Sequence, residues 1–353
     1  MMRWFLVVIV ALMVGLIFVE FKPKRPVAEQ TPVLARWVDW DAFPPLPDRP
    51  LRFPRDHGGH AEAPLETWQL QGILTTPTGR RLGFQLHIFA LGLRPGAPQR
   101  PSAWASHRYF LAYFTRTDPD AKTFHVERRY ERAALGLSGA AEDRVWVDDW
   151  ILEFNSDRLR FKAGQRGNDL KLALKFTNPP IASPENPANL RVYQFPQISA
   201  QGSWGKEPVS GSVWLQHAWG TIPLPGGPVS LHRFQLRMEK GGNLLCLQLQ
   251  RSDTAIPGPV QCFWTEPGEA QKRLTGARIT PISRWRSPGG QIYPIAWRLE
   301  SSLLDLDIEA VLPDQRIGGA LPFWSGWVRV RGRGGQGGEG FVQIIGRTEE
   351  VES

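Results

Sequence analysis

The chain has 353 residues, of which 42% are apolar and 22% are charged. This composition excludes wholesale disorder, and the length predicts about two domains. The 35 glycines and 31 prolines follow no period, which excludes collagen and favours many short elements joined by turns. Basic residues exceed acidic residues by eight, 42 against 34, and are spread along the chain. We interpret this excess as a contribution to solubility and expect no nucleic-acid partner.

Residues 1–21 predict an N-terminal membrane anchor. Trp4 to Val19 form an apolar run without a charge, and basic residues follow it. No small-residue cleavage site comes after the run, so we expect an uncleaved signal anchor, with a removed signal peptide as the alternative. The proline-rich residues 22–50 then predict a stiff linker. A short tail before a large domain favours an inner-membrane protein with its domains outside the cytoplasm, in the periplasmic cell envelope.

From residue 67 onward, most segments alternate polar and apolar residues, which is the period of a half-buried strand. Residues 67–76 and 82–91 predict one hairpin, and residues 158–164 and 169–177 predict another. The alternation in 82–91 separates two faces, with Phe84, Leu86 and Ile88 on one and Gln85, His87 and Phe89 on the other. This pattern predicts an all-β protein built of antiparallel barrels or sandwiches.

The two cysteines, Cys246 and Cys262, lie in two predicted strands on either side of a turn-rich segment. A turn centred near Thr254 would place the thiols directly opposite each other, where a disulfide is geometrically possible. Two buried free thiols are the alternative interpretation.

A glycine-rich turn before the first predicted strand, residues 53–68, concentrates ionisable side chains. They are Asp56, His57, His60, Glu62 and Glu66. Three interpretations are open for this segment. It could be a metal site, an acid/base or ligand-lining cluster, or a loop ordered by hydrogen bonds in which His57 closes one end of a barrel.

Two further segments carry candidate chemistry. His217 and Trp219 are two residues apart at a strand end, so we expect both on one face, either around a planar or cationic group or in a packed corner. Residues 145–154 predict a strand with Asp148 and Asp149 on opposite faces, which would place one carboxylate in apolar surroundings. A surface aspartate that accepts turn hydrogen bonds is the alternative.

Several familiar catalytic motifs have no match in this sequence. It contains no Gly-x-Ser-x-Gly, His-Glu-x-x-His or Cys-x-x-Cys, so nucleophilic hydrolysis and zinc-protease chemistry have no positive support. The glycine-rich residues 331–340 lack the Lys-Ser/Thr of a phosphate-binding loop, and we therefore expect no nucleotide.

The order of several motifs resembles that of a known family. These motifs are FPRDHGGH, FHVERRYERAALGLSGA, VWVDDWILEF, SGSVWLQHAWG and WRSPGGQIYPIAWRLE. From Phe53 to Gly346 the chain is similar to the AttH/CrtC-like family of lipocalin-like envelope proteins, which includes the carotenoid 1,2-hydratases (hydroxyneurosporene synthases). The resemblance implies two tandem lipocalin-like antiparallel β-barrel domains behind the anchor, over residues 51–225 and 226–353.

The resemblance also implies a function. It points to a long apolar ligand, a carotenoid or another lipid, and to the addition of water across an alkene without a cofactor. The His-x-Trp motif of the family corresponds to His217 and Trp219, and Glu66 or Asp149 is the candidate acid. We expect the ligand to be lined by His57, Trp68, His87 and Trp146.

A second function is consistent with the same resemblance. The chain has Gln216 and Ala218 where the family commonly has acidic residues. The alternative is therefore a non-catalytic lipid-binding module associated with an envelope transporter.

Overall fold

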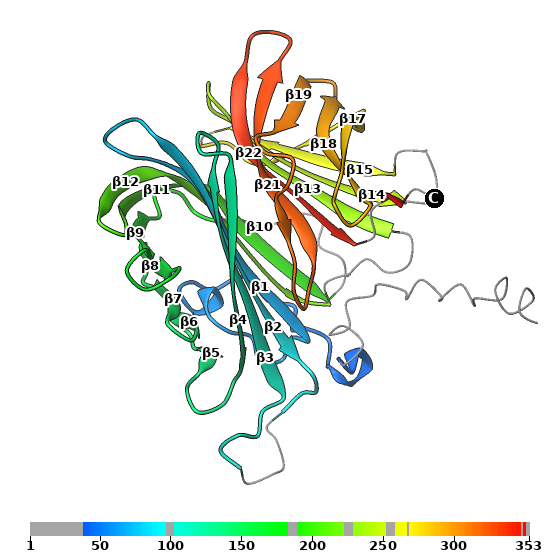
Figure 1. Cartoon of the computed structure of the whole chain (residues 1–353). Helices are drawn as coiled ribbons and strands as arrows, with labels where there is room; N and C mark the ends of the chain where they lie inside the picture. The colour runs from blue at the N-terminus through cyan, green and yellow to red at the C-terminus, as the bar shows by residue number, and fades with distance from the viewer. Residues whose placement is uncertain are drawn as a thin grey trace, which may run out of the picture. The chain divides into compact units, whose positions relative to one another are not determined.

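The computed structural model describes residues 38–96, 102–182, 189–221, 229–251, 258–266, 268–346 and 349–350 (Figure 1). The described residues belong to one compact unit. The predicted anchor, residues 1–21, lies outside the described residues. Within the described ranges, no helix is long and apolar enough to cross a membrane. The regular secondary structure of the described residues is almost entirely strand, with short 3-10 turns at Trp40–Ala42 (η2) and Arg55–His57 (η3), which confirms the all-β prediction.

The first half of the chain folds into one antiparallel sheet, drawn from blue to green in Figure 1. Its strands are β1 (Leu65–Thr75), β2 (Arg81–Gly92), β3 (Arg108–Asp118), β4 (Thr123–Arg132), β5 (Ser138–Ala140), β6 (Arg144–Val147), β7 (Trp150–Phe154), β8 (Arg158–Ala163), β9 (Leu170–Lys175), β10 (Ile181–Ala182), β11 (Leu190–Trp204) and β12 (Glu207–Gly220). The order is β4-β3-β2-β1-β12-β11-β9-β8-β7-β6-β5, with β10 paired to β11. The sheet curls until β3 and β4 contact β5 and β6, which makes it barrel-like.

The second half forms another barrel-like antiparallel sheet. Its strands are β13 (Val229–Met238), β14 (Asn243–Arg251), β15 (Val260–Thr265), β16 (Lys272–Leu274), β17 (Arg278–Arg286), β18 (Gln291–Glu300), β19 (Asp305–Ala310), β20 (Arg316–Ile317), β21 (Phe323–Gly332), β22 (Gly337–Gly346) and β23 (Glu349–Glu350). The order is β16-β15-β14-β13-β22-β21-β19-β18-β17. The predicted domain boundary after residue 225 falls outside the described residues.

Alternation along the strands decides which side chains enter each core. In β9, Leu170, Leu172 and Leu174 are buried and the intervening residues are exposed, as predicted. In β2, Phe84 belongs to the interior cluster of the first sheet, whereas His87 lies on the opposite face. The two sheets enclose separate apolar clusters, each filled with aliphatic and aromatic side chains.

The outer faces of the two sheets meet through buried polar side chains. Hydrogen bonds join Gln71 to Gln235, Gln85 to Ser325, and Arg233 to Gln69. Burial lowers the pKa of Arg233 to about 9. The glutamines of β1, β2 and β13 lie on this face, where each buried amide must find a hydrogen-bond partner.

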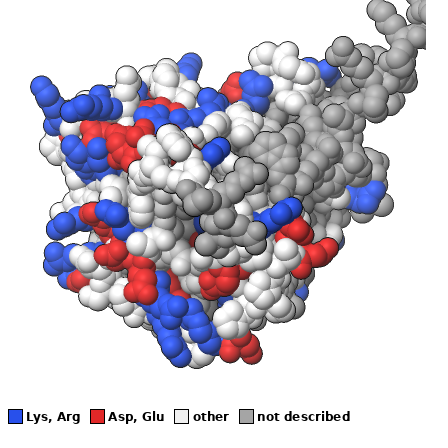
Figure 2. All heavy atoms as spheres, turned by 90° about the horizontal axis from the view of Figure 1, so that it is seen from below, with Lys and Arg blue, Asp and Glu red and all other residues white. Residues whose placement is uncertain are grey.

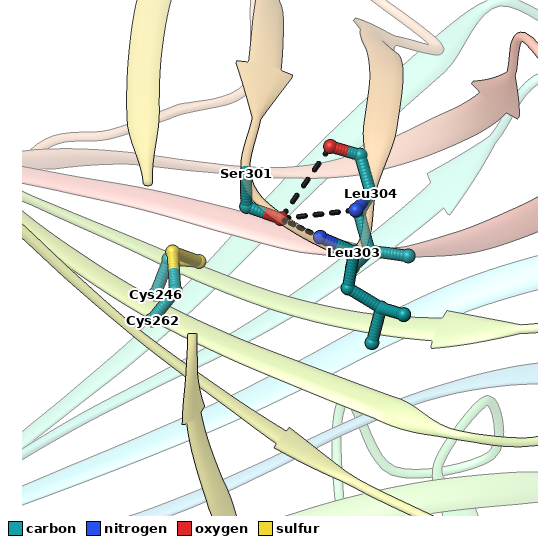
Figure 3. The surroundings of a disulfide bond; sticks show 5 residues. All are labelled: Cys246, Cys262, Ser301, Leu303 and Leu304. Carbon is teal, nitrogen blue, oxygen red and sulfur yellow. Dashed lines mark hydrogen bonds between the residues drawn. A yellow bond between two sulfur atoms is a disulfide. The ribbon is translucent and has the colours of Figure 1, made fainter. Parts of the chain in front are cut away.

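The second sheet contains the disulfide that the spacing made possible (Figure 3). Cys246 in β14 pairs directly with Cys262 in β15, and their sulfur atoms are bonded. Both residues are fully buried. In the same region, the hydroxyl of Ser301 accepts hydrogen bonds from the N–H groups of Leu303 and Leu304, which closes the turn between β18 and β19.

The prediction of one strand over residues 145–154 is wrong. The segment is a hairpin, in which Val147 of β6 pairs with Trp150 of β7 and Asp148 and Asp149 form the two-residue turn. Asp148 has φ +57°, a left-handed conformation that aspartate tolerates better than most residues. The turn therefore places both carboxylates at the surface.

Charges of both signs are mixed on the face drawn in Figure 2. Among the described residues, neighbouring ion pairs such as Arg316–Asp314 and Arg298–Asp307 recur along the strands. This distribution agrees with the dispersed charge in the sequence.

Candidate functional site

Polar side chains gather inside the first sheet where β1 begins and β12 ends. Glu66 pairs with Trp219, and Trp68 pairs with His217, so strand alternation turns all four side chains towards the interior. The turn after η3 lies against this end of the sheet. Gly58 is required there, because a Cβ atom would meet the carbonyl oxygen of a neighbouring segment at 2.0 Å.

Glu66 is the centre of this cluster and has no exposed surface. Its Oε1 atom lies 2.8 Å from Nδ1 of His60 and 3.0 Å from Nε2 of His217. Arg108 donates to Oε2 at 2.6 Å. Burial opposes ionisation of this carboxyl, but the hydrogen bonds with His217 and His60 and the charge of Arg108 lower its pKa to about 2. Glu66 is therefore a buried carboxylate held by positive or donating partners on both oxygens.

His60 connects Glu66 to a second buried carboxylate. Its Nε2 atom lies 3.3 Å from Oδ1 of Asp56. The ring is parallel to the indole of Trp219, with centroids 3.9 Å apart. Burial works against the charged imidazole, but the hydrogen bonds with Glu66 and Asp56 raise the pKa of His60. The indole face and the two carboxylates together favour a positive charge at this position.

Asp56 is anchored from the segment that precedes the turn. Arg49 donates to both of its carboxylate oxygens at 2.7 Å, and the N–H of Arg52 donates at 2.6 Å. Burial raises the pKa of Asp56, but these hydrogen bonds and that with His60 outweigh it and lower the pKa to about 2. Residues 38–50, part of the predicted linker, thus include contacts that hold the site in place.

A chain of hydrogen bonds continues from His217 to the interior. Its Nδ1 atom lies 3.1 Å from the carbonyl oxygen of Asp56 and 3.3 Å from the hydroxyl of Tyr193. The same hydroxyl is 2.7 Å from Nδ1 of His57. Burial lowers the pKa of His217, and burial together with the nearby His217 lowers that of His57 to about 3. Burial raises the pKa of Tyr193 well above its ordinary value.

A cavity of about 370 Å³ adjoins the cluster. Its ionisable lining residues are His60 and Arg108, and both contact Glu66. The remaining wall is largely apolar and includes Phe110, Ala133 and Trp146. A ligand in this cavity would therefore have an apolar surface around it and two polar groups connected to the buried carboxylate.

Two other cavities differ in their relation to the cluster. One of about 410 Å³ is lined in part by Arg49, which holds Asp56. Another of about 540 Å³ is lined by residues such as His125, Val126 and Trp204, and none of the cluster residues named above lines it.

The structure brings five of the eight sequence-predicted site residues into the cluster: Glu66, His217, Trp219, His57 and Trp68. Trp146 lines the adjoining cavity. Asp149 lies apart from them at the surface turn, 3.6 Å from Lys162. His87 lies on the opposite face of β2, where it packs against Phe323 of the second sheet.

Several residues of the site were not singled out as site residues by the sequence. Asp56 and His60 stood in the ionisable turn, and their spacing of four gave a usable signal. Arg49, Arg108 and Tyr193 gave none, because only the folded chain brings them within reach of that turn. His57 stacks on Phe154 at 4.9 Å inside the sheet, which agrees with the interpretation that this ring closes a barrel end.

Comparisons with known proteins identify the family and the fold. The AttH-like family model matches residues 44–347. The structure is similar to that of a candidate AttH protein from Nitrosomonas europaea, with a TM-score of 0.75 and 24% identity over 87% of this chain and 99% of that one. It is also similar to kievitone hydratase from Nectria haematococca, with a TM-score of 0.63 and 13% identity over 87% of this chain and 98% of that one.

At these identities the likeness to solved structures concerns the fold. No functionally curated protein matches the sequence at a significant level. The family model covers most of the chain. The chain therefore belongs to the AttH-like family.

Proposed function

We propose that this protein adds water across an alkene of a long apolar ligand, an isoprenoid such as a carotenoid or another lipid, and so acts as a hydratase. The observation that carries the proposal is the 370 Å³ cavity, whose apolar wall is interrupted by His60 and Arg108. Both of these residues contact Glu66, so the cavity has direct access to an acid/base cluster. Family membership and the fold shared with a hydratase support this choice.

In the proposed reaction, His60 first donates a proton to one alkene carbon. We assign the proton to Nε2, because its 3.3 Å contact with Asp56 is longer than the 2.8 Å contact of Nδ1 with Glu66. The carbocation formed on the other carbon is stabilised by the aromatic wall at Trp146. A water molecule then attacks that carbon and returns a proton to the neutral His60, so the catalyst is regenerated.

The other cluster residues position His60. Glu66 holds its Nδ1 atom, and Trp219 stacks on its ring. His217 contacts the same carboxylate oxygen of Glu66 and thereby holds that oxygen in place, which makes it a positioning residue in this proposal. Asp149 takes no part, because it is paired with Lys162 at the surface turn.

A non-catalytic lipid-binding module is the second candidate. The observation that favours it is the complete engagement of Glu66 and His217 by internal partners, which leaves both side chains without exposed surface. In this alternative, the cluster only stabilises the end of the sheet. The protein would then carry an apolar ligand for an envelope transport system, anchored to the inner membrane by its N-terminal segment.

The two candidates are separated by incubating the purified protein with acyclic carotenoids and searching for a product one water heavier by mass spectrometry. A hydratase produces this product, and Ala133→Trp, which fills the cavity, lowers turnover at least about tenfold. Val126→Trp is the matched control, since it places the same side chain in the separate 540 Å³ cavity.

Saturable binding of an apolar dye without any hydrated product would favour the binding module. Full turnover by Ala133→Trp would instead show that the reaction takes place outside the 370 Å³ cavity. The proposed anchor is tested separately by N-terminal sequencing of the protein from membranes, where a mature terminus beyond residue 21 contradicts it.

A further inference from the structure

Three potential metal ligands converge inside the first sheet. Nδ1 of His60, Nε2 of His217 and a carboxylate oxygen of Glu66 all lie within 4.8 Å of one another, and all three residues are buried. Two imidazole nitrogens and one carboxylate oxygen form a donor set that suits zinc and other late divalent transition metals. Such a set leaves at least one coordination position open.

We propose that His60, Glu66 and His217 bind one divalent transition-metal ion, with Zn²⁺ as the representative ion. The inference concerns only what these three side chains bind. It does not rest on the hydration reaction proposed above, and a bound ion would take the place of the proton that His60 shares with Glu66 in that reaction.

In each of the three residues, the nitrogen or oxygen atom that would not bind the ion already has a hydrogen-bond partner, as metal sites require. The other ring nitrogen of His60 faces the carboxylate of Asp56, and that of His217 faces the carbonyl oxygen of Asp56 at 3.1 Å. The second oxygen of Glu66 is held by Arg108. Histidine ligands in metal sites usually donate their remaining N–H to a carboxylate or a carbonyl in this way, which selects the tautomer and orients the ring.

The hydrogen-bond partners of the ring nitrogens of His60 and His217 also favour a bound ion. Oε1 of Glu66, Oδ1 of Asp56 and the carbonyl oxygen of Asp56 are all acceptors, so each imidazole has an acceptor at both of its nitrogens. Protons alone satisfy this arrangement when His60 carries two N–H groups and His217 either carries two or accepts a hydrogen bond at Nδ1 from the Tyr193 hydroxyl, 3.3 Å away. One divalent ion would instead allow both rings, whose centroids are 5.6 Å apart, to remain neutral.

The three donor atoms have to shift for an ion to bind. Ligand atoms around a tetrahedral zinc ion are about 3.3 Å apart, given bonds of about 2.0–2.1 Å. The Glu66 oxygen lies 2.8 and 3.0 Å from the two nitrogens and would have to withdraw by a few tenths of an ångström, and the two nitrogens, which lie within 4.8 Å of each other, would have to approach. Arg49 pairs with Asp56, and Arg108 pairs with the second oxygen of Glu66. Neither arginine occupies the atoms assigned to the ion.

The test measures metal binding by tag-free full-length protein. After treatment with a chelator, the protein is dialysed against Zn²⁺ or Co²⁺ and its metal content is determined by mass spectrometry. We expect one ion per chain and, with Co²⁺, the intense visible bands of a four- or five-coordinate site. Mg²⁺, which prefers oxygen ligands, should not compete.

His60→Gln and His217→Gln are each expected to weaken binding at least about 100-fold, since each removes one of three ligands. His232→Gln is the matched control, because this buried histidine of the second sheet contacts Ser230 and none of the three ligands, and it should leave binding unchanged. Circular dichroism verifies folding of each variant.

No stoichiometric uptake by the wild-type protein would overturn the proposal, and so would equal uptake by the two ligand variants. If a ligand variant does not fold, the wild-type cobalt spectrum decides the question, and the weak bands of a six-coordinate aqua ion would overturn the proposed site. A protein that binds zinc but hydrates no alkene would contradict the proposed function alone.

Discussion

The imidazole of His60 lies parallel to the indole of Trp219, with centroids 3.9 Å apart and 7° between the ring planes. His60 comes from the turn before β1, whereas Trp219 lies near the end of the neighbouring strand β12, so the stack fastens that turn to this end of the sheet. The contact joins the His-x-Trp motif to the ionisable turn. It thereby connects the two sequence features that carried the candidate chemistry.

This stack predicts a graded loss of stability at position 219. Trp219 is only 3% exposed, so Trp219→Leu should lower the free energy of unfolding by about 3 kcal/mol, through the lost packing and the cavity left behind. Trp219→Phe keeps an aromatic face and should lose less. Urea denaturation measures both. Trp104→Leu, at a position 56% exposed, is the control and should change stability by less than about 0.5 kcal/mol. Equal losses for the Leu and Phe variants would contradict a role for the stacked ring.

Removal of the buried charge at position 66 should destabilise the protein strongly. Glu66→Gln leaves Arg108 without its carboxylate partner, and we expect a loss of about 3–5 kcal/mol in the free energy of unfolding. Glu62→Gln removes the same charge from a partly exposed position in the same turn and serves as the control, with a change below about 0.5 kcal/mol. Similar unfolding midpoints for the two variants would show that Glu66 is not essential to this end of the sheet.

The buried histidine between the two sheets, His87, predicts that the stability of the protein falls in acid. Burial lowers the pKa of His87 from 6.5 to about 3, so the folded chain keeps this imidazole neutral. Above about pH 6.5 neither state is charged at this residue and the stability contribution is complete. As the pH falls from 6.5 towards 3, only the unfolded chain takes up the proton, and the free energy of unfolding decreases by up to about 1.4 kcal/mol per pH unit.

His87→Gln should remove this part of the pH dependence. Urea denaturation of both proteins between about pH 7 and pH 5 provides the measurement. A residual slope is expected from His57 and His232, whose pKa values burial also lowers. Parallel curves for the variant and the wild-type protein would be inconsistent with a neutral buried His87.

The disulfide in the second sheet should contribute measurably to stability. Cys246 and Cys262 are 16 residues apart, and closing a loop of that length is worth about 3 kcal/mol in the unfolded state. Reduction of the wild-type protein should therefore lower its unfolding midpoint. The double variant Cys246→Ala, Cys262→Ala should have the lower midpoint with or without reductant. An unchanged midpoint on full reduction, verified by thiol counting, would refute the contribution.

The strands and their faces were largely predictable from local pattern. The alternation in residues 82–91 and 169–177 corresponds to β2 and β9, because a strand directs successive side chains to opposite faces whatever its partner is. The same reasoning failed in residues 145–154. There, two aspartates form a turn between two short strands, and the apolar residues on both sides make the whole segment look like one strand.

The candidate site was only partly predictable, because its members are distant in sequence. His217 and Glu66 are 151 residues apart, and Tyr193 reaches His57 across 136 residues. Neighbouring residues can reveal a pair such as Asp56 and His60, but no local pattern specifies which strand will lie beside them. Arg108 is an example, because nothing in its sequence context distinguishes it and yet it donates a hydrogen bond to the second carboxylate oxygen of Glu66.

The amino-acid sequence by itself determined the all-β class, the hairpins, the facing cysteines and the motif order of the family, because these depend on short-range periodicity and spacing. Only the tertiary structure decided that β1 and β12 are neighbours, and thus that one carboxylate meets two imidazoles and a guanidinium. Strand pairing at long range depends on how the entire sheet closes around its core. That closure is a property of the folded chain and of no single segment.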